Sequence, residues 1–306
     1  MYHGVINVYK EPGYTSHDVV ACLRGILRQK KIGHTGTLDP AAQGVLPVCL
    51  GQATRLCDML ANETKTYEAV LLLGRQTDTQ DTTGRVTAQS EVQVSEDEVR
   101  LAAESFLGEY QQVPPMYSAL KVDGKKLYEL ARAGKEVERQ ARPVEILELK
   151  ITKMELPRVW MTVTCSKGTY IRTLCSDIGD QLGCGGCMEA LKRVRVGAFL
   201  AAEALTLSEI EKLRDNGTVR DAIVSVEDAL AAFPSAETVQ EADRLVKNGN
   251  PLTDGDFARD ADGFWAGLDS DTVRVSDSQG HFLGVYRCEK KSGRWRPWKM
   301  FLNLEE

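Results

Sequence analysis

The sequence has no apolar run of 18 residues, the length that a membrane-spanning helix needs, and it contains only four histidines. Its eight cysteines are scattered through 306 residues, and the start MYHGVINVYKEPGY has no basic leader followed by an apolar stretch. We therefore expect a cytoplasmic protein with reduced thiols, without a signal peptide or a membrane span. The composition, 42% apolar and 27% charged, is close to the globular average and excludes disorder.

Several catalytic motifs are also absent: GxxxxGK[ST] of P-loop NTPases, GxSxG of serine hydrolases and HExxH of zinc peptidases. Cys184 and Cys187 form a lone CxxC, whereas structural zinc commonly needs four ligands, and no histidine pair completes the set. The run 183–188 begins like a dinucleotide-binding GxGxxG but ends in Met188 and follows a helix pattern. We predict no metal site, and we interpret these glycines as a tight helix exit.

Apolar patterning predicts the elements of a first domain. Strands are expected over 5–8, 45–50, 66–73, 145–154 and 159–165, and helices over 19–27 and 171–182. The capping pair Ser95 and Glu98 predicts a further helix through about residue 106. Two short helices are expected over 208–214 and 225–231, and the charged segment 111–145 is interpreted as an insertion with a helix near 127–131. We expect an α+β fold.

A second domain is predicted from the change in composition after Phe233 and Pro234, where the chain becomes rich in Gly and Asp. Strands over 273–275 and 282–286, joined by a turn at 277–280, predict a hairpin, and 298–302 predicts a closing strand. The expected organisation is therefore a larger domain over 1–235 and a small β domain over 236–306.

The net charge of −6 is unevenly distributed. Residues 116–145 hold seven basic and five acidic side chains, and 287–299 holds six basic side chains and one acidic one. Local basic patches can bind phosphates on an acidic protein, although such runs are also typical of solvated faces.

Two single residues stand out. Asp39 precedes Pro40 in the loop GHTGTLDPAAQG, and the proline biases Asp39 toward an extended conformation that can present a carboxylate. The alternative is an ordinary Asp-Pro turn. Arg172 falls in the first turn of a predicted helix, where the helix dipole disfavours a cation. This indicates either a specific anionic partner or a surface arginine.

Four long runs resemble the TruB family of tRNA pseudouridine synthases: KIGHTGTLDPAAQGVLPVCLGQATRL (31–56), KTYEAVLLLGRQTDTQDTTG (65–84), VPPMYSALKVDGKKLYELARAG (113–134) and SKGTYIRTLCSDIGDQLGCGG (166–186). The resemblance covers about residues 4–200 in family order. Near the C-terminus, VRVSDSQGHFLGVYR and WRPWKMF resemble the small PUA-type RNA-binding domain. One departure is Lys10-Glu11-Pro12-Gly13, where the family often has Lys-Pro-x-Gly.

The resemblance implies a pseudouridine-synthase catalytic domain, with a mixed, mainly antiparallel sheet flanked by helices, and a PUA-like β domain. The implied reaction is isomerisation of the T-loop uridine of tRNA, conventional position 55. The N1–C1′ bond breaks, the flipped base turns, and a C5–C1′ bond forms. Nothing is oxidised and no group is supplied from outside, so no cofactor or metal is implied.

The resemblance also implies roles for individual residues. Asp39 matches the nucleophile, whose attack on C1′ or C6 stays open, and Arg172 matches its partner. An arginine within about 4–6 Å is expected to lower the pKa of the aspartate. The remaining matches are Tyr67, which stacks on the flipped uracil, Tyr170 and Leu191, which line the pocket, and His34, which braces the loop stack. For Tyr67, Tyr170 and Leu191, ordinary core packing is the alternative.

RNA partners follow from the same resemblance. The insertion is interpreted as a flap that closes on the tRNA T-arm through Lys125 and Lys126, and Lys290 and Lys291 are expected to contact RNA phosphates. A monomer without a protein partner is expected. Two alternatives remain. One is a guide-RNA-dependent paralogue, but such paralogues generally lack the insertion. The other is a non-catalytic RNA-binding factor, but the presence of Asp39, Tyr67 and Arg172 together favours an enzyme.

Overall fold

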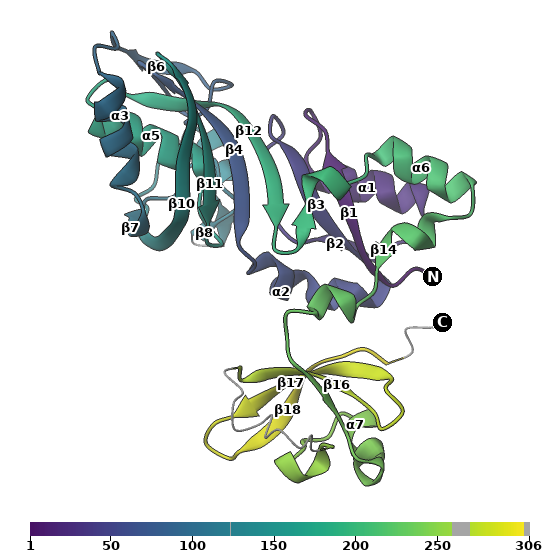
Figure 1. The fold of residues 1–306 in the computed structure, drawn as a ribbon. Helices are drawn as coiled ribbons and strands as arrows, with labels where there is room; N and C mark the ends of the chain where they lie inside the picture. The colour runs from purple at the N-terminus through teal and green to yellow at the C-terminus, as the bar shows by residue number, and fades with distance from the viewer. Residues whose placement is uncertain (123, 259–269, 303–306) are drawn as a thin grey trace.

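The computed structural model describes residues 1–122, 124–258 and 270–302. The chain forms a ten-stranded sheet with helices against it and a separate four-stranded sheet from residue 235 onward (Figure 1). The mixed large sheet, its helices and the small β domain confirm the predicted α+β class. In the described ranges, no helix combines the length and the apolar character that crossing a bilayer requires.

The large sheet has two halves joined by its central strand β12. β12 pairs antiparallel with β4 on one side and parallel with β3 on the other. The strand order along the main path is β14 (Ile223–Val224), β1 (Gly4–Lys10), β3 (Gln43–Leu50), β12 (Gly186–Val196), β4 (Lys65–Leu73), β11 (Arg158–Cys165), β10 (Arg142–Glu155) and β7 (Gly108–Gln112). Two short strands extend it, β2 (Ile32–His34) beside β3 and β13 (Phe199–Leu200) beside β12.

Each half of the sheet is covered by its own helices (Figure 1). α1 (Ser16–Ile26) and α6 (Leu207–Asp215) cover the β1–β3 half, and Val19 and Leu23 of α1 join Ile6 and Leu46 in one apolar core. α3 (Glu96–Glu104) and α5 (Ile171–Gln181) cover the β4–β11–β10 half, where α5 buries its apolar face. The expected capping pair Ser95 and Glu98 opens α3.

The remaining helices, turns and hairpins of the described residues are short. The helices are α2 (Cys57–Ala61), α4 (Leu127–Arg132) and α7 (Asp243–Lys247), with 3-10 turns η1 (Gly51–Leu56), η2 (Ala201–Glu203), η3 (Val219–Ala222), η4 (Asp228–Leu230), η5 (Gln240–Ala242) and η6 (Asp254–Asp256). The hairpins are β5 (Arg75–Thr77) with β6 (Val86–Gln89), and β8 (Lys121–Val122) with β9 (Lys125–Lys126).

Several expected elements differ from the observed ones. No strand was predicted over β12, although it is central to the sheet. The expected helix over 225–231 is only the 3-10 turn η4, and α7 was not anticipated. Residues 111–112 and 142–145 of the expected insertion belong to β7 and β10, which pair with each other, so the chain leaves the sheet only over 113–141. The glycine exit is confirmed, because Gly183 adopts a positive φ of 74° just after α5.

The small sheet consists of β15 (Ser235–Glu237), β16 (Thr272–Ser276), β17 (Phe282–Glu289) and β18 (Arg294–Met300). The predicted hairpin is confirmed, while the closing strand begins earlier than expected and ends at Met300. Phe301 and Val285 pack with Ala53 and Leu56 of η1 in one apolar cluster. Lys299 forms an ion pair of 3.0 Å with Asp58 of α2. The small domain is therefore packed against the segment that directly follows β3.

Candidate active site

Asp39 lies in the loop 35–42, between β2 and β3. Leu38 and Ala42 on either side of it are buried in the apolar core, at 3% and 1% exposure. The Asp39 side chain itself is 35% exposed. The loop is thus anchored in the core by its apolar side chains, and it presents one carboxylate to solvent.

Arg172 meets this carboxylate from the first turn of α5. Its Nη1 lies 3.4 Å from Oδ2 of Asp39 and 3.9 Å from Oδ2 of Asp81. Its Nη2 donates to the backbone carbonyl of Tyr117 in the insertion segment. The Arg172 side chain is only 7% exposed, so this cation is buried among carboxylate and carbonyl oxygens. Of the two interpretations of Arg172 from the sequence, the structure shows the specific anionic partner and not the surface arginine.

Asp81 was missed in the sequence, although its surroundings carried a signal. Its Oδ1 accepts bonds from the Thr79 hydroxyl at 2.8 Å and from the backbone N and hydroxyl of Thr83 at 2.9 and 2.6 Å. These bonds leave Oδ2 to face Arg172. The run TDTQDTTG is rich in residues whose side chains bond nearby backbone, which is typical of a built polar turn.

Arg172 lowers the pKa of Asp39 as expected, but the net shift of that pKa is upward. Burial raises the pKa of this carboxyl above its usual value, and this effect is larger than the opposing attraction of Arg172. The negative charge of Asp81 raises the pKa further, whereas Lys10 lowers it. The sequence argument counted the arginine but neither the loss of hydration nor the second carboxylate.

Tyr67 lies on β4 with its side chain in the core cluster that contains Leu38. It is 8% exposed, and its register partner on β12 is Arg193. Burial raises the pKa of the Tyr67 phenol, and the positive charge of Arg193 opposes this. Leu191, one repeat earlier on β12, packs against the same cluster. The phenol therefore stays protonated next to the Asp39 loop.

Arg193 is a second residue that the sequence did not reveal. It is 1% exposed, and its Nε donates to the Val45 carbonyl at 2.8 Å, while its Nη2 donates to the Gly36 carbonyl at 3.4 Å. A side chain on Gly44 would meet the Arg193 backbone at 2.1 Å, so only glycine allows β3 and β12 to approach here. Arg193 thereby ties the Asp39 loop to the central strand.

Tyr170 is the residue before α5, and a side chain from β7 holds its backbone. Oε1 of Gln112 accepts from the Tyr170 amide at 2.8 Å, and Nε2 of Gln112 donates to the Tyr170 carbonyl at 3.0 Å. Gln112 is 2% exposed. The Tyr170 ring lies 5.8 Å from the Arg172 guanidinium, and burial raises the pKa of its phenol. Gln112 thus fixes the start of the helix that carries Arg172.

His34 ends β2, half-buried on the segment that leads to Asp39. Burial and the nearby Arg193 lower the pKa of its imidazole. Its buried Nδ1 has no hydrogen-bond partner among the described residues. The geometry places His34 beside the site loop without a contact to the Asp39 carboxylate.

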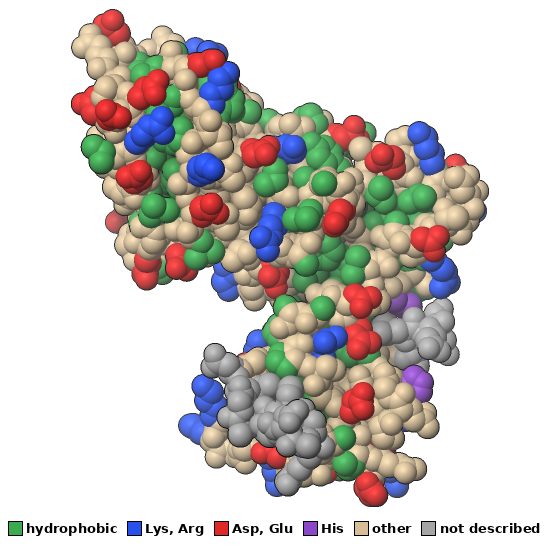
Figure 2. All heavy atoms as spheres, viewed as in Figure 1, with side chains coloured by type: hydrophobic (Ala, Val, Ile, Leu, Met, Phe, Trp, Pro, Cys, Tyr) green, Lys and Arg blue, Asp and Glu red, His purple; other side chains and the backbone are tan. Residues whose placement is uncertain are grey.

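The four expected RNA-binding lysines belong to two segments, the insertion and the small domain. Lys125 and Lys126 form β9 in the insertion, and Lys290 and Lys291 lie in the turn between β17 and β18. Among the described residues, no hydrogen bond or ion pair joins any of them to Asp39, Tyr67 or Arg172. On the face shown in Figure 2, blue and red side chains are intermixed.

Cys184 and Cys187 are both buried, and burial raises the pKa of the Cys187 thiol to about 11. In the part of the chain that the structure describes, no three His, Cys, Asp or Glu side chains are grouped as metal ligands. The donor set for a metal that the lone CxxC would need is therefore not assembled around these thiols.

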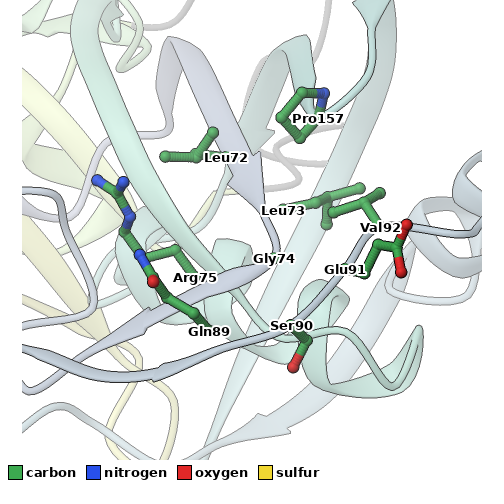
Figure 3. A pocket seen from close by; sticks show the side chains of 9 residues that line it. All are labelled: Leu72, Leu73, Gly74, Arg75, Gln89, Ser90, Glu91, Val92 and Pro157. Carbon is green, nitrogen blue, oxygen red and sulfur yellow. The ribbon is translucent and has the colours of Figure 1, made fainter.

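Two cavities flank the β5–β6 hairpin. One of about 380 Å³ lies at the end of β4 between Leu73, Val92 and Pro157, and it contains none of the expected site residues (Figure 3). The other, of about 510 Å³, lies between that hairpin, the insertion and α5, and it is lined by Gln80 and Tyr117 next to the Arg172 cluster. Of these two cavities, the one of about 510 Å³ adjoins the candidate active site.

Comparison with known proteins assigns the chain to a family. The N-terminal domain model of TruB family pseudouridylate synthases matches residues 24–171, and the tRNA pseudouridylate synthase B C-terminal domain model matches residues 172–231. A tRNA pseudouridine synthase B of Lachnoclostridium phytofermentans is 48% identical, with 98% of this chain and all of that protein covered. This chain belongs to the TruB family. It is therefore a pseudouridine synthase, an isomerase.

Other relatives agree with TruB membership. A tRNA pseudouridine synthase B of Geobacter sulfurreducens is 44% identical, with 95% of this chain and 97% of that protein covered. Among solved structures, a Cbf5-Nop10-Gar1 complex contains a chain 28% identical with a TM-score of 0.77, with 99% of this chain and 86% of that chain covered. A chain in the structure of an H/ACA RNP bound to a substrate RNA is 26% identical with a TM-score of 0.74. The match again covers 99% of this chain and 86% of that chain.

Proposed function

We propose that this TruB-family enzyme converts the T-loop uridine of tRNA, conventional position 55, to pseudouridine with Asp39 as the nucleophile. The relatives that are 42–48% identical are named tRNA pseudouridine synthase B, which supports tRNA as the substrate. The observation that carries the chemistry is the pair of Asp39 and Arg172, 3.4 Å apart, beside the buried ring of Tyr67.

The reaction rearranges one nucleotide. The N1–C1′ bond breaks, the uracil turns while bound, C5 bonds to C1′, and the proton leaves C5 while N1 gains one. Because every atom comes from the substrate or from water, the chemistry calls for a nucleophile and a pocket, and for no cofactor. Asp39 attacks as a carboxylate, at C1′ or at C6 of the base. Arg172 stabilises that charge, and Asp81 holds Arg172 in place.

Tyr67 would stack on the flipped uracil, with Tyr170 and Leu191 as the walls of the pocket. Extracting a base from its stack costs a few kcal/mol, which contacts to the RNA must offset. We propose that His34 braces the gap that the flipped base leaves in the stacked bases of the T-loop. Lys125 and Lys126 of the insertion, and Lys290 and Lys291 of the PUA-like domain over 236–306, would bind phosphates.

We further propose that the enzyme acts as a cytoplasmic monomer with no protein partner. The neighbouring solved structures are a Cbf5-Nop10-Gar1 complex and an H/ACA RNP bound to a substrate RNA, but those chains are only 26–28% identical. The insertion over 113–141 supports the standalone mode, because guide-dependent paralogues generally lack such a segment. The pairing of Asp39 with Arg172 argues against a purely RNA-binding role.

The test uses purified protein without any other RNA or protein. A T-arm minihelix is incubated with it, and the nucleosides are separated after digestion. We expect pseudouridine at the position equivalent to 55, and none in a minihelix that carries cytidine there. Conversion only when a guide RNA is added would favour the paralogue, and binding without conversion would favour the non-catalytic factor.

A further inference from the structure

The stretch from the last residue of β1 to the first residue of α1, residues 10–16, contacts the Asp39 loop on both sides of the aspartate. On the far side, the Gly13 amide donates to the Pro40 carbonyl at 2.8 Å. The Lys10 ammonium, whose residue is fully buried, donates to the carbonyls of Pro40 and Ala42. Burial lowers the pKa of Lys10 to about 8. The backbone after Asp39 is therefore fixed by this segment.

On the near side, Ser16 binds the residue directly before Asp39. Its Oγ accepts from the Leu38 amide at 2.9 Å and donates to the Leu38 carbonyl at 3.4 Å. Ser16 and Leu38 are 2% and 3% exposed, so water does not compete for these bonds. A hydroxyl can donate and accept together, which allows one side chain to bind both polar groups of one residue.

Ser16 is not needed as the helix cap. Thr15 caps α1, because its side chain accepts from the Asp18 amide while Asp18 bonds back to the Thr15 amide. The capping box is exposed to solvent, and its hydrogen bonds stay within residues 15–18. Thr15 therefore caps the helix, and the adjacent Ser16 binds Leu38. Thr15→Ala is a matched control, because it removes a neighbouring hydroxyl that does not bind the loop.

The Asp39 carboxylate needs such support from its backbone. Its ion-pair partner Arg172 lies at 3.4 Å, longer than a strong charge-assisted hydrogen bond, and a third of its side chain is open to solvent. The direction of the carboxylate is then set by where the Leu38–Asp39 peptide lies. A misplacement of about 1 Å in a reacting group can reduce a rate about 100-fold.

We propose that Ser16 is a positioning residue for catalysis, and that its hydroxyl fixes the Leu38–Asp39 peptide so that the carboxylate faces both Arg172 and the substrate. This inference rests on the proposed role of Asp39. Ser16 contacts neither the substrate nor Arg172, so its removal should slow the chemical step and leave RNA binding in place.

The test compares Ser16→Ala, Ser16→Thr and Thr15→Ala in single-turnover reactions with saturating enzyme on full tRNA. We expect Ser16→Ala to slow the chemical step about 10- to 100-fold, with the tRNA Kd within about twofold of the wild-type value. Ser16→Thr, which keeps the hydroxyl, should recover most of the rate. Thr15→Ala should lower the Tm by a few degrees and leave the rate unchanged.

A second readout separates positioning from general destabilisation. Arg172 and Lys10 lower the Asp39 pKa, and Asp81 raises it. If Asp39 moves away from Arg172 in Ser16→Ala, the acidic limb of the pH–rate profile should shift to higher pH. If Ser16→Ala does not fold, Ser16→Cys, with its weaker donor and acceptor, should give an intermediate rate and the same direction of shift.

The proposal is overturned if folded Ser16→Ala or Ser16→Cys reacts at the wild-type rate with an unshifted profile, or if Thr15→Ala slows the reaction equally. Asp39→Asn is run in parallel. An inactive Asp39→Asn with an unimpaired Ser16→Ala would overturn the role of Ser16 alone. An active Asp39→Asn would overturn the proposed nucleophile itself.

Discussion

Asp39 and Asp81 share one counterion: Nη1 of Arg172 lies 3.4 Å from the first carboxylate and 3.9 Å from the second. Two like charges near one cation oppose each other, and Asp81 accordingly raises the pKa of Asp39. The same Asp81 keeps Arg172 in position for Asp39. The second carboxylate thus stabilises the position of Arg172 and, at the same time, weakens the acidity of Asp39.

Asp81→Asn tests this opposition. The amide can keep an oxygen acceptor for Thr79 and Thr83 but removes the negative charge, so the Asp39 pKa should fall. Because the proposed mechanism uses ionised Asp39, the acidic limb of the pH–rate profile should move to lower pH. The rate on the plateau should fall about tenfold as Arg172 loses one partner. An acidic limb that moves to higher pH would contradict the account.

Gln112→Ala tests the support of Tyr170. The substitution leaves the Tyr170 amide without its partner, which costs about 1–3 kcal/mol in a buried site, while the Tyr170 carbonyl still accepts from the Leu174 amide. We expect a lower Tm and a chemical step slowed about tenfold, because Arg172 lies two residues further along the same chain. Gln111→Ala, its exposed neighbour on β7, is the matched control and should behave like the wild type.

The basic side chains of the insertion are tested by salt dependence. Replacing Lys125 and Lys126 together by alanine should weaken tRNA binding and flatten the plot of log affinity against log salt by about one to two units. The bound-state chemical step should be nearly unchanged. Lys212→Ala, an exposed lysine of α6, is the control. An unchanged slope would mean that Lys125 and Lys126 are solvent-exposed lysines that do not bind RNA phosphates.

Lys290 and Lys291 extend the same test to the small domain. Their replacement by alanine should weaken binding of full tRNA and leave binding of an isolated T-arm unchanged, because the small domain would reach a part of tRNA that the isolated arm lacks. Equal losses on both RNAs would mean that the small domain contacts the T-arm itself.

The small domain contains a pH-dependent contact of its own. Asp277 is 1% exposed, with an ion pair to Lys247 at 2.9 Å, and bonds from Lys247 and the 279–281 turn lower its pKa to about 2. A lowered pKa stabilises the fold above the usual aspartate value, and this stability is lost as the pH falls from about 4 to 2. Asp277→Ala should reduce stability by about 2–4 kcal/mol at pH 7 and flatten the loss in that window. Thermal unfolding between pH 2 and 7 measures both, and an unchanged pH profile would contradict the assignment.

Much of the fold could be predicted because its patterns are local. Every second residue of β4, including Tyr67, Ala69 and Leu71, points into the core. The capping box marks the start of α3 in the sequence. β12 was missed because two register shifts, between Met188 and Ala190 and between Arg193 and Arg195, interrupt its alternation. The buried Arg193 also makes a core position look like a surface one.

The site could be predicted only in part for a related reason. Asp39 and Arg172 belong to distinctive local sequence runs. Asp81, Gln112 and Lys10 instead support the site through contacts with residues far away in the sequence. Lys10 meets residues 30 and 32 positions away, and Gln112 meets one 58 positions away. The net pKa of Asp39 likewise depends on burial, which local spacing does not describe.

The most direct measurement is single-turnover conversion of tRNA by Asp39→Asn with saturating enzyme. The amide keeps the shape of the side chain but removes the charge that attacks the substrate. We predict a rate more than about 10³-fold below wild type, about 4 kcal/mol of barrier, with the tRNA Kd within a few-fold of the wild-type value. Conversion within tenfold of the wild-type rate would contradict the assignment of Asp39 as the nucleophile.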